Sequence, residues 1–191
     1  MRGTRQQKAE TRQRIVEAAG RLFRSHGIDA VGVDAVMHAA GLTHGGFYGH
    51  FPSKEALVAE VAAASLARSA ARWERISAED PPEQALGRIV GAYLDPTHVA
   101  DAERGCVLTT LGPEVARRAE ARPAIAASVR VMAEALRRCG AGGEQAALAT
   151  LSTLVGAVVL ARLADSPQLA ESILSAAKAQ IKSPPPRSGR G

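Results

Sequence analysis

The residue types best suited to binding chemistry gather between Gly41 and Glu55, in the stretch GLTHGGFYGHFPSKE. There the phenol of Tyr48, the imidazole of His50 and the ammonium of Lys54 stand near an expected helix N-terminus, and all three suit an anion. The five histidines of the chain show no spacing typical of metal ligands or of a nucleophile and its base, and no carboxylate pair stands out. The stretch therefore indicates contact with a polyanion, and no catalytic residue or metal site is expected.

Two helices that are predicted upstream from apolar periodicity would hold this stretch in place. In the first, apolar residues recur at i, i+3, i+4, i+7 and i+8, and Gly27 suits the C-terminal cap of that helix. These apolar residues are Ile15, Ala18, Ala19, Leu22 and Phe23. A shorter helix follows from about Val33 to Ala40, after which Gly41-Leu42-Thr43 predicts a tight turn.

A third short helix is expected from Thr43, its N-cap, to His50. Short helices joined by such a turn predict a helix-turn-helix, whose second helix enters the major groove of DNA. The residues expected against the base edges are Thr43, His44, Gly45 and Gly46. Because each glycine costs about 1 kcal/mol in helix propensity, this element must depend on the packing of Leu42, Phe47 and Phe51.

In these residues, the segment from Ala9 to Val61 resembles the N-terminal DNA-binding domain of the TetR family, the tetracycline-repressor-like bacterial regulators. The resemblance covers about a quarter of the chain. It rests on Gly41-Leu42-Thr43, Phe47-Tyr48, His50-Phe51 and Ser53-Lys54-Glu55-Ala56-Leu57. Gly32 and Gly49 depart from the family pattern. The resemblance implies an all-helical homodimer that binds double-stranded DNA and whose divergent C-terminal part binds an inducer.

By the same resemblance, Tyr48, His50 and Lys54 would contact phosphate oxygens. Tyr48 and His50 could instead be structural, and Lys54 could be merely solvated. Arg5 and Lys8 are expected to precede the first helix and to form an arm in the minor groove.

Positive charge gathers at both ends of the chain, whose net charge is +5. Residues 1–54 carry eight Lys/Arg against four Asp/Glu, residues 178–191 carry four Lys/Arg and no acid, and residues 55–177 have a net charge of −3. This asymmetry is expected when one end meets a polyanion. Solubilisation is the alternative reason for both basic ends.

Composition agrees with a cytoplasmic regulator. A chain of 191 residues fits one or two small domains, and 46% apolar content is ample for a core. The polar N-terminus lacks the apolar region of a secretory signal, and the two cysteines, Cys106 and Cys139, fit free thiols. No G-x-G-x-x-G or Walker pattern occurs, so no cofactor and no enzyme activity are expected.

The remaining pattern predicts helices only, so the expected fold class is all-α. A long helix capped by Ser53 should reach Ile76, and Pro96 should follow the end of a later helix. Further helices are expected over residues 83–94, 106–118 with a break at Gly112-Pro113, 123–139, 144–164 and 169–181. The expected domains are a three-helix DNA-binding domain over 1–54, a helical inducer-binding and dimerisation domain over 55–182, and a disordered tail over 183–191.

The helix over 144–164 has no charged residue for 17 positions, from Gln145 to Ala161. That run is too short for a convincing membrane span, which needs about 20 apolar residues, so a buried helix and no membrane association are expected. With the last helix it would form a four-helix dimer interface; completing a monomeric core is the alternative. The residues expected in this interface are Leu151, Val155, Gly156, Val158 and Ile173.

An inducer site is expected around Trp73 and Tyr93, because these are the only aromatic residues outside the DNA-binding segment and rings supply much contact area. Packing alone could explain both. Cys106 also belongs to this candidate site: it opens an expected helix beside Arg104, a setting that favours a reactive sensor thiol, although a lone cysteine is commonly a small buried hydrophobe.

Together these observations predict a ligand-responsive transcriptional regulator that binds a pseudo-palindromic operator as a homodimer and is released by a small-molecule inducer. Action as a repressor is expected from the resemblance, because repression is the commonest role in the family. One alternative is a small-molecule-binding helical bundle whose helix-turn-helix is vestigial. Another is a repressor that senses electrophiles or oxidants through Cys106.

Overall fold

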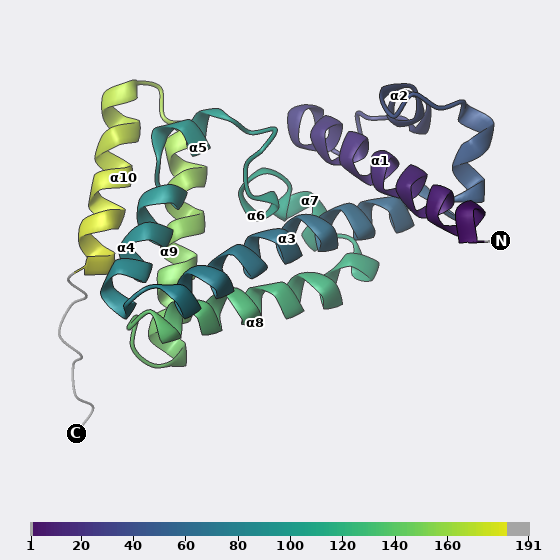
Figure 1. The fold of residues 1–191 in the computed structure, drawn as a ribbon. Helices are drawn as coiled ribbons and strands as arrows, with labels where there is room; N and C mark the ends of the chain where they lie inside the picture. The colour runs from purple at the N-terminus through teal and green to yellow at the C-terminus, as the bar shows by residue number, and fades with distance from the viewer. Residues whose placement is uncertain (1, 183–191) are drawn as a thin grey trace. The chain divides into compact units, whose positions relative to one another are not determined.

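All regular elements of the protein are helical in the computed structural model, which describes residues 2–182 (Figure 1). No strand occurs in this range, so the predicted all-α class is confirmed. The tail predicted to be disordered, residues 183–191, lies outside the described residues.

The described chain forms two compact units, each built from two separate segments. The first unit contains the residues up to Ser69 together with Ala102–Val129, and the second contains Ala70–Asp101 together with the described residues from Arg130 on. The whole segment predicted to bind DNA lies in the first unit. The functional boundary predicted after residue 54 stays a prediction.

The first unit is built around the helices of the helix-turn-helix segment. Its elements are α1 (Arg2–His26), α2 (Val33–Ala39), the 3-10 helix η1 (His44–Gly49), the first part of α3 (Lys54–Glu79), α6 (Val107–Thr110), α7 (Gly112–Ala116), the 3-10 helix η2 (Ala119–Ala121) and the start of α8 (Arg122–Arg138). α1 packs against α2, and α2 against η1. The core includes the fully buried side chains of Ile15, Phe23, Phe47, Phe51 and Leu57.

α1 ends as the sequence predicts but begins earlier. Gly27 adopts φ 83°, which favours glycine, and its N–H donates to the Phe23 carbonyl at 2.8 Å. At the other end, Arg5 and Lys8 lie inside the helix, so the prediction of an arm preceding it is wrong. The reason is local: residues 5–14 are mostly good helix formers, and Gln6 donates to Glu10 at 3.0 Å one turn later.

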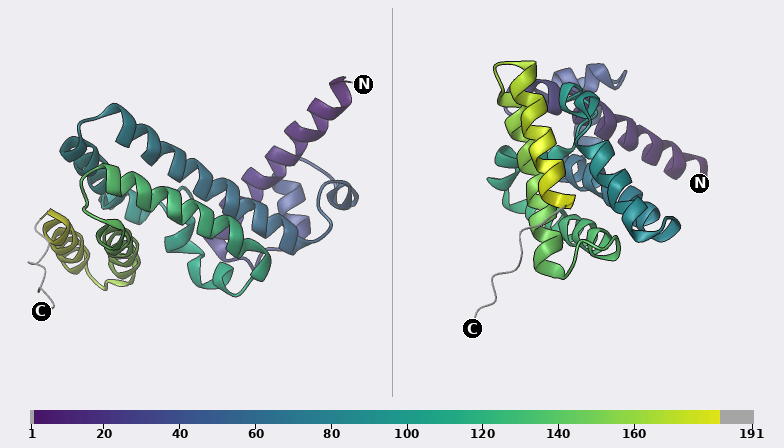
Figure 2. Two further views of the ribbon diagram at one scale, coloured as in Figure 1. Left: turned by 90° about the horizontal axis from the view of Figure 1, so that it is seen from below. Right: turned by 90° about the vertical axis from the view of Figure 1, so that its left-hand side faces the viewer.

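The second unit contains the later part of α3, α4 (Pro82–Tyr93), α5 (Pro96–Ala100), the later part of α8, α9 (Glu144–Leu163) and α10 (Pro167–Lys182). α9 packs against α10 and α5, and α9 and α10 lie side by side (Figure 2). α5 is missed by the sequence analysis, which treats Pro96 only as the end of a helix. Pro96 instead begins α5, because Asp95 accepts a hydrogen bond from the Thr97 N–H at 2.8 Å and caps it.

α9 is apolar on nearly all sides, and burial shows which side faces its own chain. Leu151 and Val158, predicted to lie in a dimer interface, are only 5% and 0% exposed within the single chain. Their side chains offer no surface to a partner, which corrects that prediction; Val155, Gly156 and Ile173 are half-buried. By length and composition α9 also resembles a membrane span, but the core helix of a soluble protein passes the same test.

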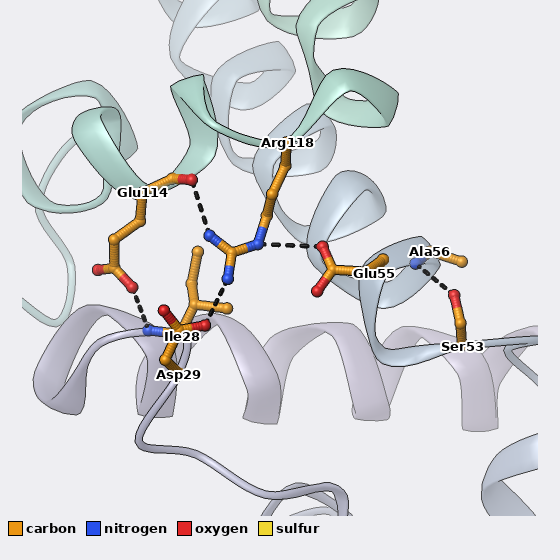
Figure 3. A network of polar contacts seen from close by, with 7 residues as sticks. All are labelled: Ile28, Asp29, Ser53, Glu55, Ala56, Glu114 and Arg118. Atoms are coloured by element: carbon orange, nitrogen blue, oxygen red, sulfur yellow. Dashed lines mark hydrogen bonds and ion pairs between the residues drawn. The ribbon is translucent and has the colours of Figure 1, made fainter.

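A polar network in the first unit ties α7 to the turn after α1 and to the start of α3 (Figure 3). One oxygen of the Glu114 carboxylate accepts a hydrogen bond from the N–H of the buried residue Ile28 at 2.8 Å. Arg118, whose side chain is 15% exposed, donates to Asp29 at 2.6 Å and to Glu55 at 3.0 Å. Its third bond, at 2.7 Å, goes to the Glu114 carbonyl. The turn after α1 and the N-terminus of α3 are thus held by two side chains, those of Glu114 and Arg118.

We expect Glu114→Ala to lower the free energy of unfolding by about 2 kcal/mol, because the N–H of buried Ile28 loses its acceptor. Glu114→Gln is the matched control: its side-chain oxygen still accepts, so the loss should stay below about 1 kcal/mol. Urea unfolding followed by circular dichroism measures both. Equal losses in the two variants would contradict a role for this hydrogen bond.

Candidate nucleic-acid interface

The turn between α2 and η1 depends on one glycine. Gly41 adopts φ 69°, and its N–H donates to the His38 carbonyl at 2.9 Å. The Leu42 N–H then donates to the Met37 carbonyl at 2.9 Å, which closes the end of α2. A residue with a Cβ would be strained at Gly41, so the predicted helix-turn-helix owes its tight turn to that position.

The third element, predicted as a short helix, is a 3-10 helix. Thr43 occupies its N-cap position, but its side chain makes no capping hydrogen bond. Gly45 and Gly46 both weaken helix formation, by about 1 kcal/mol each, and six residues are too few to offset this through regular α-helical hydrogen bonds. The element spans the predicted residues.

The outer face of η1 presents polar and backbone groups. Thr43, His44, Gly45 and Gly46 are all exposed, and the Tyr48 side chain is 66% exposed. An added Cβ atom at Gly45 would meet nothing within 4 Å, so the backbone there is open to a close approach. Such a surface suits contact with base edges, where small residues let the backbone come near.

His44 does not extend freely from this face. Its Nδ1 contacts a carboxylate oxygen of Asp34 on α2, and both side chains are more than half exposed. The contact orients the imidazole and brings an acidic group to the edge of the same surface. Asp34 was not predicted from the sequence as a site residue, because only the geometry of the turn brings it beside His44.

The inner face of η1 is held by two phenylalanines. The rings of Phe47 and Phe51 are fully buried and stack with centroids 5.8 Å apart. The guanidinium of Arg12 on α1 lies 3.9 Å above the Phe51 ring, donates to the His50 carbonyl and pairs with Glu60 on α3. Arg12 therefore links three elements. Its partners lie 38 and 48 residues away in sequence, so no local pattern could have indicated this role.

The predicted phosphate-binding residues Tyr48, His50 and Lys54 lie from the end of η1 to the first residue of α3. Ser53 caps α3 as predicted, because its hydroxyl accepts a hydrogen bond from the Ala56 N–H at 3.1 Å. Lys54 is half-buried, whereas Lys8 on α1 is exposed. The helix N-terminus and the ammonium group together suit an anion.

His50 is half-buried and lies near positive charge. Its Nδ1 is buried without a hydrogen-bond partner. Burial, followed by the positive charges of Lys8 and Arg12, lowers the pKa of His50 below its usual value near 6.5. The imidazole is therefore neutral at neutral pH in the free protein, and an approaching anion would favour its protonation.

We expect His50 to make stability fall as the pH is lowered. The unfolded chain takes up the proton near pH 6.5, before the folded state does, so the loss begins there and ends below the folded-state pKa. Urea unfolding between about pH 7.5 and 5 should show a smaller decrease for His50→Gln than for the wild type. His38→Gln, on the exposed side of α2, serves as the control and should behave like the wild type. Identical pH profiles for the wild type and His50→Gln would contradict this prediction.

Comparisons with known proteins agree with this geometry. A family model described as bacterial regulatory proteins, tetR family, matches residues 15–61. The HTH-type transcriptional regulator AcrR of Shigella flexneri is 40% identical over 60 residues, which are 31% of this chain and 28% of that protein. The uncharacterized HTH-type transcriptional regulator YerO of Bacillus subtilis is 30% identical over 89 residues, and the chain spans 31% of its length.

A third relative is matched over most of its length. The uncharacterized HTH-type transcriptional regulator TtgW of Pseudomonas putida is 34% identical over 101 residues, which are 51% of this chain and 70% of that protein. Solved structures share the fold. A TetR-family regulator from Agrobacterium tumefaciens has a TM-score of 0.75 at 19% identity, with 92% of this chain and 97% of that chain covered. The reduced form of NemR from E. coli has a TM-score of 0.73 at 20% identity, with 89% and 96% covered. The chain spans less than half the length of the first two of these relatives but 70% of the third, and it belongs to the TetR family of bacterial regulatory proteins.

Proposed function

We propose that this regulator is a ligand-responsive repressor that binds a pseudo-palindromic operator as a homodimer, in the cytoplasm, and is released by a small-molecule inducer. The observation that carries the proposal is the two-sided character of η1. Buried Phe47 and Phe51 hold it from within, while its outer face exposes Thr43, the glycine backbone and Tyr48. This combination of a buried inner face and an exposed polar outer face favours DNA binding over a vestigial helix-turn-helix.

In this proposal, η1 lies in the major groove. One set of residues contacts the bases, and another contacts the phosphates. Thr43, His44, Gly45 and Gly46 face the base edges, where sequence is recognised. The remaining residues contact phosphate oxygens and set the orientation: Arg5, Lys8, Tyr48, His50 and Lys54. Because Arg5 and Lys8 belong to α1, a helical approach to the phosphates replaces the extended arm predicted from the sequence.

Regulators of this family act as dimers, and an exposed leucine stripe on α9 supports dimerisation through the second unit. Leu148, Leu160 and Leu163 are 40%, 56% and 76% exposed and form this stripe, whereas Leu151 and Val158 are buried. Leu169 adds an exposed leucine at the start of α10. Half-buried Val155 and Gly156 adjoin the stripe, so we propose that it meets the same stripe of a second copy.

We place the inducer near Trp73 and Tyr93. Both side chains are buried, and their ring centroids lie 5.6 Å apart in an edge-to-face arrangement. The His98 ring packs on Tyr93 at 4.8 Å, so three rings gather in the second unit. Aromatic walls supply much contact area for a small apolar inducer.

The electrophile-sensing alternative finds less support. Cys106 stands at the N-cap position of α6, as the sequence analysis expects, but it is only 6% exposed. Its carbonyl accepts the Thr109 hydroxyl at 2.8 Å within a buried turn. Cys139 is also buried, and burial, with a further contribution from Asp80, raises the pKa of its thiol. Reaction requires an accessible thiolate, so burial favours the packing role for both cysteines.

The proposed DNA contacts predict a specific salt dependence. Lys54→Ala should weaken binding to all duplexes similarly and make the plot of log affinity against log salt shallower by about one unit per subunit, because one phosphate contact is lost. Lys182→Ala, at the exposed end of α10, is the control and should leave the slope unchanged. Gel shifts on a duplex selected from a random pool measure the slope.

His44→Ala tests recognition rather than affinity in the same assay, since it should change which duplexes are selected. An unchanged slope for Lys54→Ala would reject its phosphate contact. Failure of the wild type to select any sequence, or to bind duplex at low salt, would favour the vestigial alternative.

The proposed interface predicts that Leu163→Glu splits the dimer. An unpaired carboxylate buried against the partner costs about 3 kcal/mol or more, which raises the dimer dissociation constant about 100-fold. The single chain should tolerate the change, because Leu163 is exposed within it. Ala67→Glu, on an exposed part of α3, is the control. Sedimentation velocity at micromolar concentration separates monomer from dimer, and an intact dimer of Leu163→Glu would contradict this interface.

A further inference from the structure

A cavity of about 280 Å³ lies between α1 and α3 within the first unit, and none of its lining residues belongs to the proposed DNA, inducer or dimer contacts. Its charged lining is mostly basic. Arg21 and Arg24 come from α1 and Arg68 from α3, whereas Glu17 is the only carboxylate among the described residues that line it. Three arginines from two helices thus line one small cavity.

A hydrogen bond and close packing fix the position of the Arg24 side chain, which lines this cavity. Its Nε donates to the backbone carbonyl of Glu103, and the Glu103 carboxylate in turn accepts the Ser25 hydroxyl at 2.9 Å. The Arg24 guanidinium lies against Gly20, where an added Cβ would approach Nη1 to 3.2 Å and Nη2 to 3.7 Å. Gly20 stands inside α1 without a positive φ, so its backbone does not require glycine. The missing side chain makes room for the guanidinium, at a cost in helix propensity.

The other two arginines bring positive charge that the protein leaves unmatched. The side chains of Arg21 and Arg68 are exposed, and within residues 2–182 neither side chain forms a hydrogen bond or an ion pair. The Glu17 carboxylate accepts the Gln13 amide at 2.8 Å instead of an arginine. Guanidinium groups repel one another, whereas an oxyanion among them makes charge-assisted, bidentate hydrogen bonds.

We propose that this cavity binds a small organic anion. Its carboxylate or phosphate group lies against Arg21, Arg24 and Arg68, which line the cavity. The volume is at the low end for ligand sites, so it suits a compact anion. The site goes beyond the proposed function, because it uses neither the DNA surface nor the aromatic cluster. A ligand that touches both α1 and α3 stabilises the first unit by mass action.

The test uses the full chain without DNA and two probes that share a butyl chain and differ in the anionic group, pentanoate and butyl phosphate. Calorimetric titration should show one site per chain for at least one of them, and that probe should raise the melting temperature more than sodium chloride at equal ionic strength. The tighter probe identifies the anion class. Arg68→Gln should weaken its affinity about tenfold, because a charge-assisted hydrogen bond is lost.

Two further variants make the result specific. Gly20→Ala should also weaken the probe several-fold, since it displaces the Arg24 guanidinium while leaving every charge in place. Arg75→Gln, which removes an exposed arginine of α3 outside the cavity, should leave the affinity unchanged. The proposal is overturned if neither probe binds, if sodium chloride reproduces the stabilisation, or if Arg68→Gln and Arg75→Gln have the same effect. Because no DNA is present, none of these outcomes depends on the repressor proposal.

Discussion

The burial of Phe47 and Phe51 is the interaction on which the recognition surface depends. Glycines make up half of the six residues of η1, so local propensity cannot hold this element in shape. The stacked rings supply the missing stability from the core side, and Arg12 covers one of them while pairing with Glu60. α1, η1 and α3 are therefore one packed cluster, and the exposed glycine backbone is a consequence of that packing.

α1 is the element that all of these contacts share. Near its middle, Arg12 contacts the His50 carbonyl at the end of η1 and Glu60 on α3; near its end, Arg24 lies over Gly20 and lines the proposed anion cavity. Just beyond it, Glu114 fixes the N–H of Ile28. A shift of α1 along its axis would disturb all three sets of contacts.

Sequence alone predicted the features that depend on neighbouring residues. The helical class, the glycine cap at Gly27, the tight turn at Gly41 and the Ser53 cap all follow from local pattern and are confirmed. The side of α9 that faces its own core could not be predicted, because apolar residues surround the helix. The contacts of Arg12 and Arg118 were missed for another reason: their partners lie up to 89 residues away.

Amide hydrogen exchange in Phe47→Leu tests most directly whether core packing shapes η1. Three reporter amides bond within this element: Gly46 to the Thr43 carbonyl at 3.1 Å, and His50 and Phe51 to the Phe47 carbonyl at 2.9 Å. If packing holds η1, protection at these amides should fall at least about tenfold, since losing part of the buried ring costs more than about 1.4 kcal/mol. Unchanged protection at all three amides, in a chain whose DNA affinity is also unchanged, would contradict the central role of the buried phenylalanines.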